Sequence, residues 1–230
     1  MLFRSVLYIW KNATINLRIA PKGTTEIVNY LTIGTKVIVV DNEIKKYPFT
    51  VQEIKPRKNL NDTNDILNFK GYNIKGFWVK VQVSSGEIGY IFDGYLSKLK
   101  PDFELTEVYF DSNLKKIKTF NKKFLKDNSD NKYYRQRIYK NGSYIIEKGS
   151  NYDGHGHYFM PSIMLEEGYL LAVKTRPNML EMHKTSGDAT TIYKYDGNQL
   201  SFSTSLEAIT IKKITYKGTK GIELIFEAWD

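Results

Sequence analysis

Two histidines, His155 and His157, lie two positions apart in the glycine-rich segment 152–158, YDGHGHY, and could bind a metal ion. Side chains two positions apart point to the same side of an extended strand, as paired metal ligands do. Asp153 or the pair Glu166-Glu167 could add carboxylate ligands. The segment therefore permits a zinc site, but a glycine-rich polar turn carrying two solvent-facing imidazoles explains the same residues without a metal.

Complete catalytic motifs are missing from the sequence. The only further histidine is His183, and the sequence contains no HExxH motif, no G-x-S-x-G elbow, no P-loop and no dinucleotide-binding fingerprint. The chain also has no cysteine, which excludes disulfides, thiolate metal sites and cysteine nucleophiles. These observations predict a noncatalytic protein that holds no cofactor and no metal, with His155 and His157 as the remaining metal candidates.

The positive charge of the chain is concentrated in its first hundred residues. The formal net charge is +9; residues 1–100 hold 15 Lys and Arg against 8 Asp and Glu, and the remainder holds 19 against 17. A basic surface favours anionic partners such as wall polymers, although it also serves solubility. The lysine-rich stretch 115–126, with Phe120 and Phe124, could contact phosphates and bases. No nucleic-acid motif accompanies it, so no nucleic-acid partner is predicted.

Composition and patterning predict a mainly β protein of two domains. The chain is 41% hydrophobic and 14% aromatic, which is typical of a folded protein. Segments rich in Ile, Val, Tyr, Phe and Thr alternate with Gly, Asn and Asp, as in antiparallel strands and turns. The pattern stops at Pro101, which predicts domains over 1–100 and 101–230. No apolar run approaches the roughly 20 residues of a membrane-spanning helix, so no transmembrane segment is predicted.

In the first domain, strands are expected over 34–40, 77–83 and 87–92, with a turn at 84–86. The polar, lysine- and asparagine-rich segment from about 43 to 76 is expected to be a long insertion loop with some strand over 49–54.

In the second domain, strands are expected over 104–110 and in hairpins whose turns lie at Asn141-Gly142, Asp196-Gly197 and 217–220. A charged loop is expected over 122–132. Residues 114–120 are expected to form a strand or, alternatively, 114–125 a basic amphipathic helix. The C-terminal strands predict a meander or a small barrel.

Four segments of the first domain occur in an order that resembles the bacterial SH3-like domain family, over about residues 7–100. They are Ile15-Asn16-Leu17-Arg18-Ile19-Ala20-Pro21-Lys22, Ile33-Gly34-Thr35-Lys36-Val37, Trp78-Val79-Lys80-Val81, and Gly86-Glu87-Ile88-Gly89-Tyr90-Ile91 followed by Tyr95-Leu96. The resemblance implies a small β-barrel, from which the insertion over about 43–76 departs because it far exceeds a normal loop of the family. The strand patterning predicts that a second, antiparallel β-rich domain of unknown role follows.

The resemblance also implies a function, because members of this family commonly bind cell-wall peptidoglycan or a protein partner without catalysis. Aromatic residues near the expected groove could stack on sugar or peptide: Tyr8, Trp10, Tyr47, Phe49, Phe92 and Tyr95. We therefore expect a noncatalytic cell-envelope protein whose ligand is peptidoglycan or a peptide. The alternatives are a wall-acting hydrolase with its site in residues 102–230, acting through His155 and His157, and an inhibitor or immunity-type protein.

The first five residues, MLFRS, carry a separate hypothesis. Apart from their start, the codons ATG-CTC-TTC-CGA-TCT, which would encode these residues, resemble the end of a sequencing adapter, so residues 1–5 are interpreted as an assembly artefact. On this hypothesis an export signal is missing from the chain, and the expected location is the periplasm or cell envelope. A genomic read that continues in frame through the same codons would refute it.

Overall fold

The computed structural model describes residues 5–40, 45–60, 66–101, 116–125, 131–150, 153–175, 192–204 and 206–229. Antiparallel strands dominate these residues, which confirms the mainly β class. The chain divides into two compact units, one comprising Met1–Lys55 with Tyr72–Glu104 and the other Pro56–Gly71 with Leu105–Asp230. Among the described residues, no helix has both the length and the apolar character needed to cross a bilayer.

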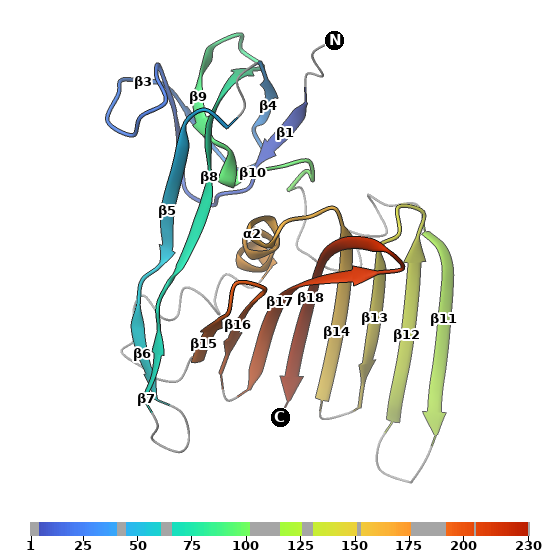
Figure 1. Ribbon diagram of the computed structural model, residues 1–230. Helices are drawn as coiled ribbons and strands as arrows, with labels where there is room; N and C mark the ends of the chain where they lie inside the picture. The colour runs from blue at the N-terminus through green and yellow to red at the C-terminus, as the bar shows by residue number, and fades with distance from the viewer. Residues whose placement is uncertain are drawn as a thin grey trace. The chain divides into compact units, whose positions relative to one another are not determined.

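The first unit is an antiparallel sheet of short strands in the order β10-β1-β4-β8-β9-β2-β3, with β5 paired to β8 outside this path (Figure 1). Within the described residues, no pairing joins β3 back to β10, so the sheet stays open where the resemblance implied a small barrel. A 3-10 turn, η1, at Asp93–Tyr95 leads from β9 into β10. The strands are β1 Val6–Ile9, β2 Ile15–Arg18, β3 Ile27–Leu31, β4 Lys36–Val39, β5 Pro48–Ile54, β8 Tyr72–Val83, β9 Ile88–Phe92 and β10 Leu96–Ser97.

Alternating apolar side chains of these strands form the core of the first unit. Such alternation buries one face of each strand. Gly89 is needed here because a Cβ atom would lie 2.7 Å from the carbonyl oxygen of Arg18, where β9 meets β2. The core residues are Ile9, Leu17, Leu31, Val37, Val79, Val81, Val83, Ile91 and Leu96.

The expected insertion loop is instead a long hairpin. β5 pairs with β8 from Pro48 opposite Phe77 to Ile54 opposite Tyr72, and β6 (Arg57–Leu60) then pairs with β7 (Ile66–Phe69). The strand expected over 49–54 is confirmed as β5, whose half-buried residues alternate with exposed ones. The rest of the loop prediction was wrong, because polar composition concealed β6, β7 and the first residues of β8. The β6–β7 tip belongs to the second unit.

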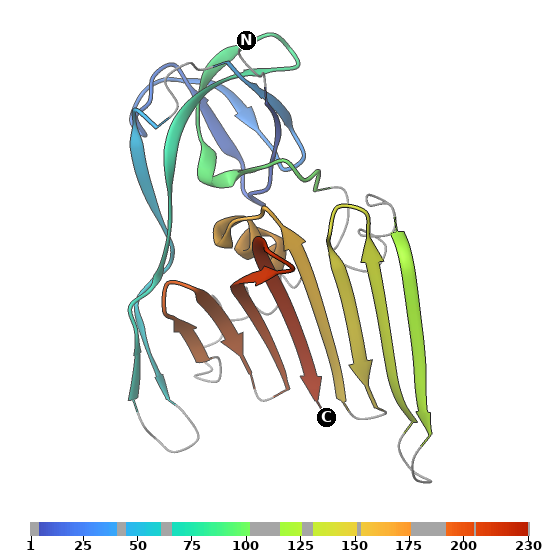
Figure 2. The ribbon, with the colours of Figure 1, turned by 45° about the vertical axis from the view of Figure 1, so that its right-hand side comes forward.

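The second unit contains an eight-stranded antiparallel sheet in the order β11-β12-β13-β14-β18-β17-β16-β15, which forms one layer (Figures 1 and 2). The four C-terminal strands, β15 to β18, pair in chain order and form a meander, as expected. The strands are β11 Lys116–Leu125, β12 Asn131–Tyr139, β13 Tyr144–Gly149, β14 Asp153–Pro161, β15 Ile192–Tyr195, β16 Gln199–Ser203, β17 Glu207–Tyr216 and β18 Thr219–Trp229.

The hairpin predictions of this unit are confirmed, and their turns have the backbone that the sequence favours. Gly142 and Gly197 adopt φ values of 87° and 91°, and the two-residue turn Lys217-Gly218 has φ values of 48° and 80°. Positive φ at both central residues is the geometry of a type I′ hairpin turn.

Three other expectations are corrected. Residues 116–125 form strand β11, so the alternative of a helix over 114–125 is wrong for these residues. A run of lysines between apolar residues is compatible with both helical and strand periodicity. The charged loop over 122–132 is wrong at both ends, where β11 and β12 extend into it. The segment around His155 is the central strand β14 and not a turn. The expected strand over 104–110 lies outside the described residues.

One face of this sheet is covered by helix α2, Leu165–Thr175, which packs on β17 and β18. This helix was not predicted, although Glu166 and Glu167 lie in its first turn and the Glu167 carboxylate accepts a hydrogen bond from the Met164 amide at 3.0 Å. The core beneath it comprises Leu165, Tyr169, Leu171, Ala172, Leu200, Phe202, Ile209, Ile211, Ile222 and Leu224.

Candidate functional site

The first unit contains a cavity of about 300 Å³, here named the aromatic groove, that is lined by three of the six predicted ligand-binding residues: Phe49, Phe92 and Tyr95. Trp78 also lines it. The four rings are contiguous: Phe49 lies 5.1 Å from Trp78 and 5.3 Å from Phe92, and Phe92 lies 5.1 Å from Tyr95, between ring centroids. The groove also includes Lys11, Ala13, Thr14, Ile15, Asn16, Arg18, Gly23 and Val51.

A close approach between β8 and η1 holds the rings in place. A Cβ atom on Gly76 would lie 2.2 Å from Asp93 Oδ1 and 2.9 Å from the Phe92 ring, so only glycine permits this packing. Asp93 Oδ1 accepts a hydrogen bond from the Phe77 amide at 2.7 Å. Burial raises the pKa of Asp93, even though backbone hydrogen bonds act in the opposite direction.

Two cations, Lys11 and Arg18, line the groove, and Glu53 contacts two of its lining residues. Glu53 accepts a hydrogen bond from the Tyr95 hydroxyl at 2.5 Å and forms an ion pair with Lys11. The Lys11 ammonium lies 4.9 Å from the centre of the Tyr95 ring, within the range of a cation–π interaction. Arg18 is anchored by a hydrogen bond to the carbonyl oxygen of Thr25. The groove therefore places two cations beside a cluster of rings, and Glu53 offsets one of them.

The other three predicted residues do not line the aromatic groove. Trp10 is only 2% exposed, and its indole Nε1 donates a hydrogen bond to the Leu99 carbonyl at 2.6 Å, so it has a structural role. The Tyr47 ring packs edge-on against Tyr90 with centroids 6.3 Å apart. Tyr8 lies on β1, opposite Ser97 of β10 and Lys36 of β4.

Lys11 and Arg18 were missed as groove residues, and Trp78 was not among the predicted ligand-binding residues. The Trp78 side chain is only 7% exposed and yet lines the groove, so this ring belongs both to the core and to the groove wall. Lys11 lies outside the regular strands, where no periodic signal marks its direction. Only the three-dimensional arrangement of β5, β8 and η1 identifies these side chains.

His155 and His157 share one face of β14, as their spacing predicted, and each contacts a carboxylate of β18. His155 Nδ1 lies 3.2 Å from Glu227 Oε1, and His157 Nδ1 lies 3.2 Å from Glu223 Oε1. His155 Nε2 also lies 3.7 Å from Asp153 Oδ2. Among the residues that the structure describes, no group of three or more potential ligands could hold a metal ion.

Glu223 is the centre of a hydrogen-bond network on this face. It accepts a hydrogen bond from the Tyr144 hydroxyl at 2.7 Å, and Lys212 Nζ lies 3.0 Å from its second oxygen. Burial alone would raise the pKa of Glu223, but the hydrogen bonds from His157, Tyr144 and Lys212 outweigh it and lower the pKa to about 2. Burial and the bond to Glu223 raise the pKa of Tyr144. His157 is thus one partner of an ionised structural carboxylate.

Comparison with known proteins identifies no relative of this chain. No family model matches the chain, and it matches none of the curated proteins or solved structures with which it was compared.

Proposed function

We propose that this chain is a noncatalytic, exported cell-envelope protein whose aromatic groove binds cell-wall peptidoglycan or a peptide ligand. The observation that carries the proposal is the contiguous cluster of Phe49, Trp78, Phe92 and Tyr95 beside Lys11 in one cavity. A small number of charged groups within an aromatic lining is typical of a site that orients a ligand and supplies apolar contact.

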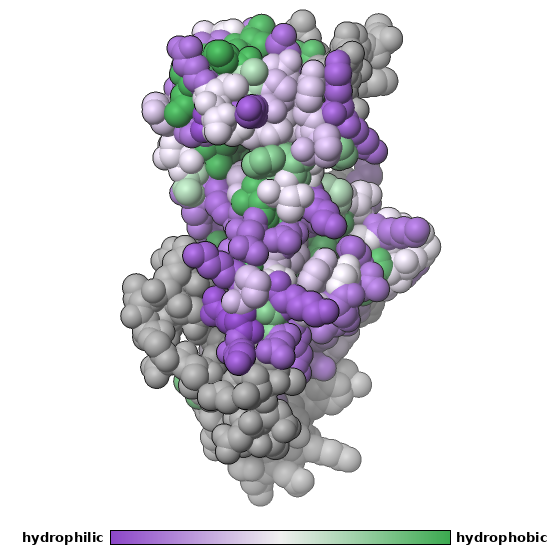
Figure 3. All heavy atoms as spheres, turned by 60° about the vertical axis from the view of Figure 1, so that its left-hand side comes forward, coloured by the Kyte–Doolittle hydropathy of each residue, from purple (hydrophilic) through white to green (hydrophobic). Residues whose placement is uncertain are grey.

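The chemistry of the groove suits a ligand with apolar faces and acidic groups. Ring surfaces stack on the apolar faces of sugars and peptides, and the Arg18 guanidinium attracts carboxylates, whereas the charge of Lys11 is offset by Glu53. Figure 3 shows that, over the first unit, hydrophobic residues reach the surface among hydrophilic ones. The positive charge of residues 1–100 would add long-range attraction to an acidic polymer, which salt screens.

The proposal is tested by cosedimentation of the full chain with purified sacculi at low and at moderate salt. Retention that persists at moderate salt is expected, because ring contacts are not screened as surface charges are. Retention that disappears with salt would show attraction by charge alone and would contradict a specific groove.

The same assay separates the other classes of function. A wall-acting hydrolase would release soluble fragments, and His157→Ala would abolish the release. An inhibitor would form a stable complex with one protein and would not be retained on sacculi. The proposal expects neither result, and it expects that replacement of both His155 and His157 by alanine leaves retention unchanged.

A further inference from the structure

A second cavity, of about 370 Å³, lies in the second unit and is lined by acidic and aromatic residues. We name it the glutamate pocket. The carboxylates of two glutamates, Glu147 and Glu207, lie on its side of the sheet, and its described lining includes no lysine or arginine, in a chain that has 34 of these basic residues. The lining residues are Tyr133, Glu147, Gly154, His155, Gly156, Tyr158, Thr175, Glu207, Ala208, Ile209, Phe226, Glu227 and Ala228.

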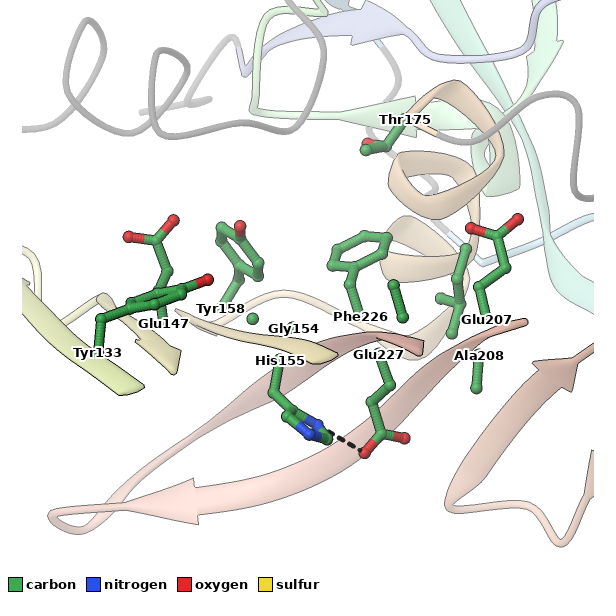
Figure 4. Close-up of a pocket in the computed structure, with 13 residues that line it drawn as sticks. Tyr133, Glu147, Gly154, His155, Tyr158, Thr175, Glu207, Ala208, Phe226 and Glu227 are labelled. Atoms are coloured by element: carbon green, nitrogen blue, oxygen red, sulfur yellow. Dashed lines mark hydrogen bonds and ion pairs between the residues drawn. The ribbon is translucent and has the colours of Figure 1, made fainter. Parts of the chain in front are cut away.

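The strands direct these side chains to two faces, and only one face builds the pocket. Figure 4 shows Glu147, Tyr158 and Glu207 rising from the sheet toward Thr175 of α2, while His155 and Glu227 point away on the other side. The alternation of side chains along β14 and β18 produces this separation.

Glycines open the floor of the glutamate pocket. Gly154 and Gly156 project no side chain into it, and a Cβ atom on Gly154 would meet nothing within 4 Å. A Cβ atom on Gly156 would instead lie 2.7 Å from the ring of Tyr158. The two glycines therefore leave space beside Tyr158 that any other residue of β14 would fill or distort.

Aromatic rings and carboxylates form the walls. The rings of Tyr158 and Phe226 stand at 83° to each other with centroids 5.5 Å apart, and Tyr133 is 45% exposed. Glu147 lies on the side of Tyr133 and is balanced by an ion pair with Arg137. Glu207 lies on the opposite side, and no ion pair reaches its carboxylate from the described residues.

From this geometry we propose that the glutamate pocket binds an organic cation, an ammonium group carried on a carbon chain. Ring faces attract ammonium groups, and a desolvated site strengthens this attraction. The carboxylate of Glu207 supplies the counter-charge, and the pocket volume exceeds that of a single ammonium group, so part of the carbon chain enters with it. This site belongs to the second unit alone and does not depend on the function proposed for the aromatic groove.

The test titrates the full chain with choline and, as a neutral probe of the same shape, with 3,3-dimethylbutan-1-ol, using calorimetry. We expect saturable binding of choline and at least about tenfold weaker binding of the neutral probe. Equal binding of both probes, or no saturable binding of any cation, would overturn the proposal. A third arm with an Nα-acetyl-lysine amide distinguishes a lysine side chain from a free quaternary amine as the source of the ammonium group.

Two variants locate the site. Glu207→Gln is expected to weaken choline binding roughly tenfold, whereas Glu227→Gln removes a carboxylate of the adjacent strand that faces away and is expected to change it less than about twofold. Tyr158→Phe keeps the ring and retains binding, and Tyr158→Leu loses it. Thermal unfolding verifies that each variant folds. Equal losses in Glu207→Gln and Glu227→Gln would overturn the assignment to this pocket.

Discussion

Glu223 is a nearly buried carboxylate whose ionised form is held by three donors. Its pKa of about 2 in the folded protein lies below the ordinary glutamate value of 4.5, so the ionised side chain stabilises the fold at pH values above 4.5. The stabilisation is lost as the pH falls from about 5 toward 2, because the folded protein must then bind a proton that the unfolded chain already holds. The shift corresponds to a contribution on the order of 3 kcal/mol.

Glu223→Gln is therefore predicted to flatten the pH dependence of the free energy of unfolding between pH 5 and pH 2, and to lower stability at pH 7. Urea unfolding at a series of pH values measures both effects. Glu26→Gln, at an exposed position of the first unit, serves as the control and should keep the wild-type profile. A Glu223→Gln profile parallel to that of the wild type would contradict the network.

At the scale of elements, β14 and β18 approach each other closely at Gly221. A Cβ atom at this position would lie 2.2 Å from the carbonyl oxygen of Met160 and 2.8 Å from Pro161 Cα, both of which are backbone atoms that cannot rotate away. The approach pairs the start of β18 with the end of β14 in the centre of the sheet.

Gly221→Ala is predicted to destabilise the protein by about 1–3 kcal/mol, because the added methyl group forces the strands apart. Denaturant unfolding gives the value. Gly154→Ala adds the same methyl group where nothing lies within 4 Å, and it should change stability much less. Equal effects at the two positions would show that the loss reflects the flexibility of glycine and not the approach of the strands.

The sequence predicted the elements whose signals are local. Turn residues such as Asn141-Gly142 located the hairpins, since the favoured turn geometry depends on a few adjacent residues. Helix α2 was missed because its eleven residues are mostly buried, so the polar face that marks an amphipathic helix is narrow. The spacing of His155 and His157 correctly predicted a shared face, but their carboxylate partners lie about 70 residues away, on β18.

Only half of the predicted ligand-binding residues line the aromatic groove, and the cause is again a contact between residues distant in sequence. Aromatic type marks a residue as large and apolar, but whether the ring enters the core or lines a cavity depends on how strands distant in sequence pair. Phe49 lines the groove, whereas Tyr47, two residues earlier, contacts Tyr90. Resemblance and composition could not distinguish these two rings.

At the scale of the whole molecule, the hairpin that interrupts the first unit supplies its tip to the second. Within the second unit, the Phe69 ring lies 5.3 Å from that of Tyr193, and the Arg57 guanidinium lies 4.4 Å from the centre of the same ring. Phe69 and Tyr193 are 5% and 3% exposed. The β6–β7 tip therefore completes the packing around β15, an edge strand of the eight-stranded sheet of the second unit.

Replacing residues 55–71 by an Asn-Gly turn, which joins the paired residues Ile54 and Tyr72 directly, is predicted to destabilise the second unit on the order of 3 kcal/mol. The reason is the loss of a buried ring contact at Tyr193. The aromatic groove should keep its ligand binding, because no residue that lines it is removed. Thermal unfolding and cosedimentation measure the two effects, and unchanged stability would contradict the packing role of the tip.

If the aromatic groove binds the ligand, Phe49→Ala and Tyr47→Ala in the full chain should differ in affinity. Both substitutions truncate a half-buried ring next to or within β5, but only Phe49 lines the groove. The measurement is the affinity of each variant for soluble peptidoglycan fragments, followed by tryptophan fluorescence. Phe49→Ala is predicted to weaken binding at least about tenfold, with Tyr47→Ala close to wild type. Equal affinities for the two variants, or no binding by the wild type, would contradict the claim.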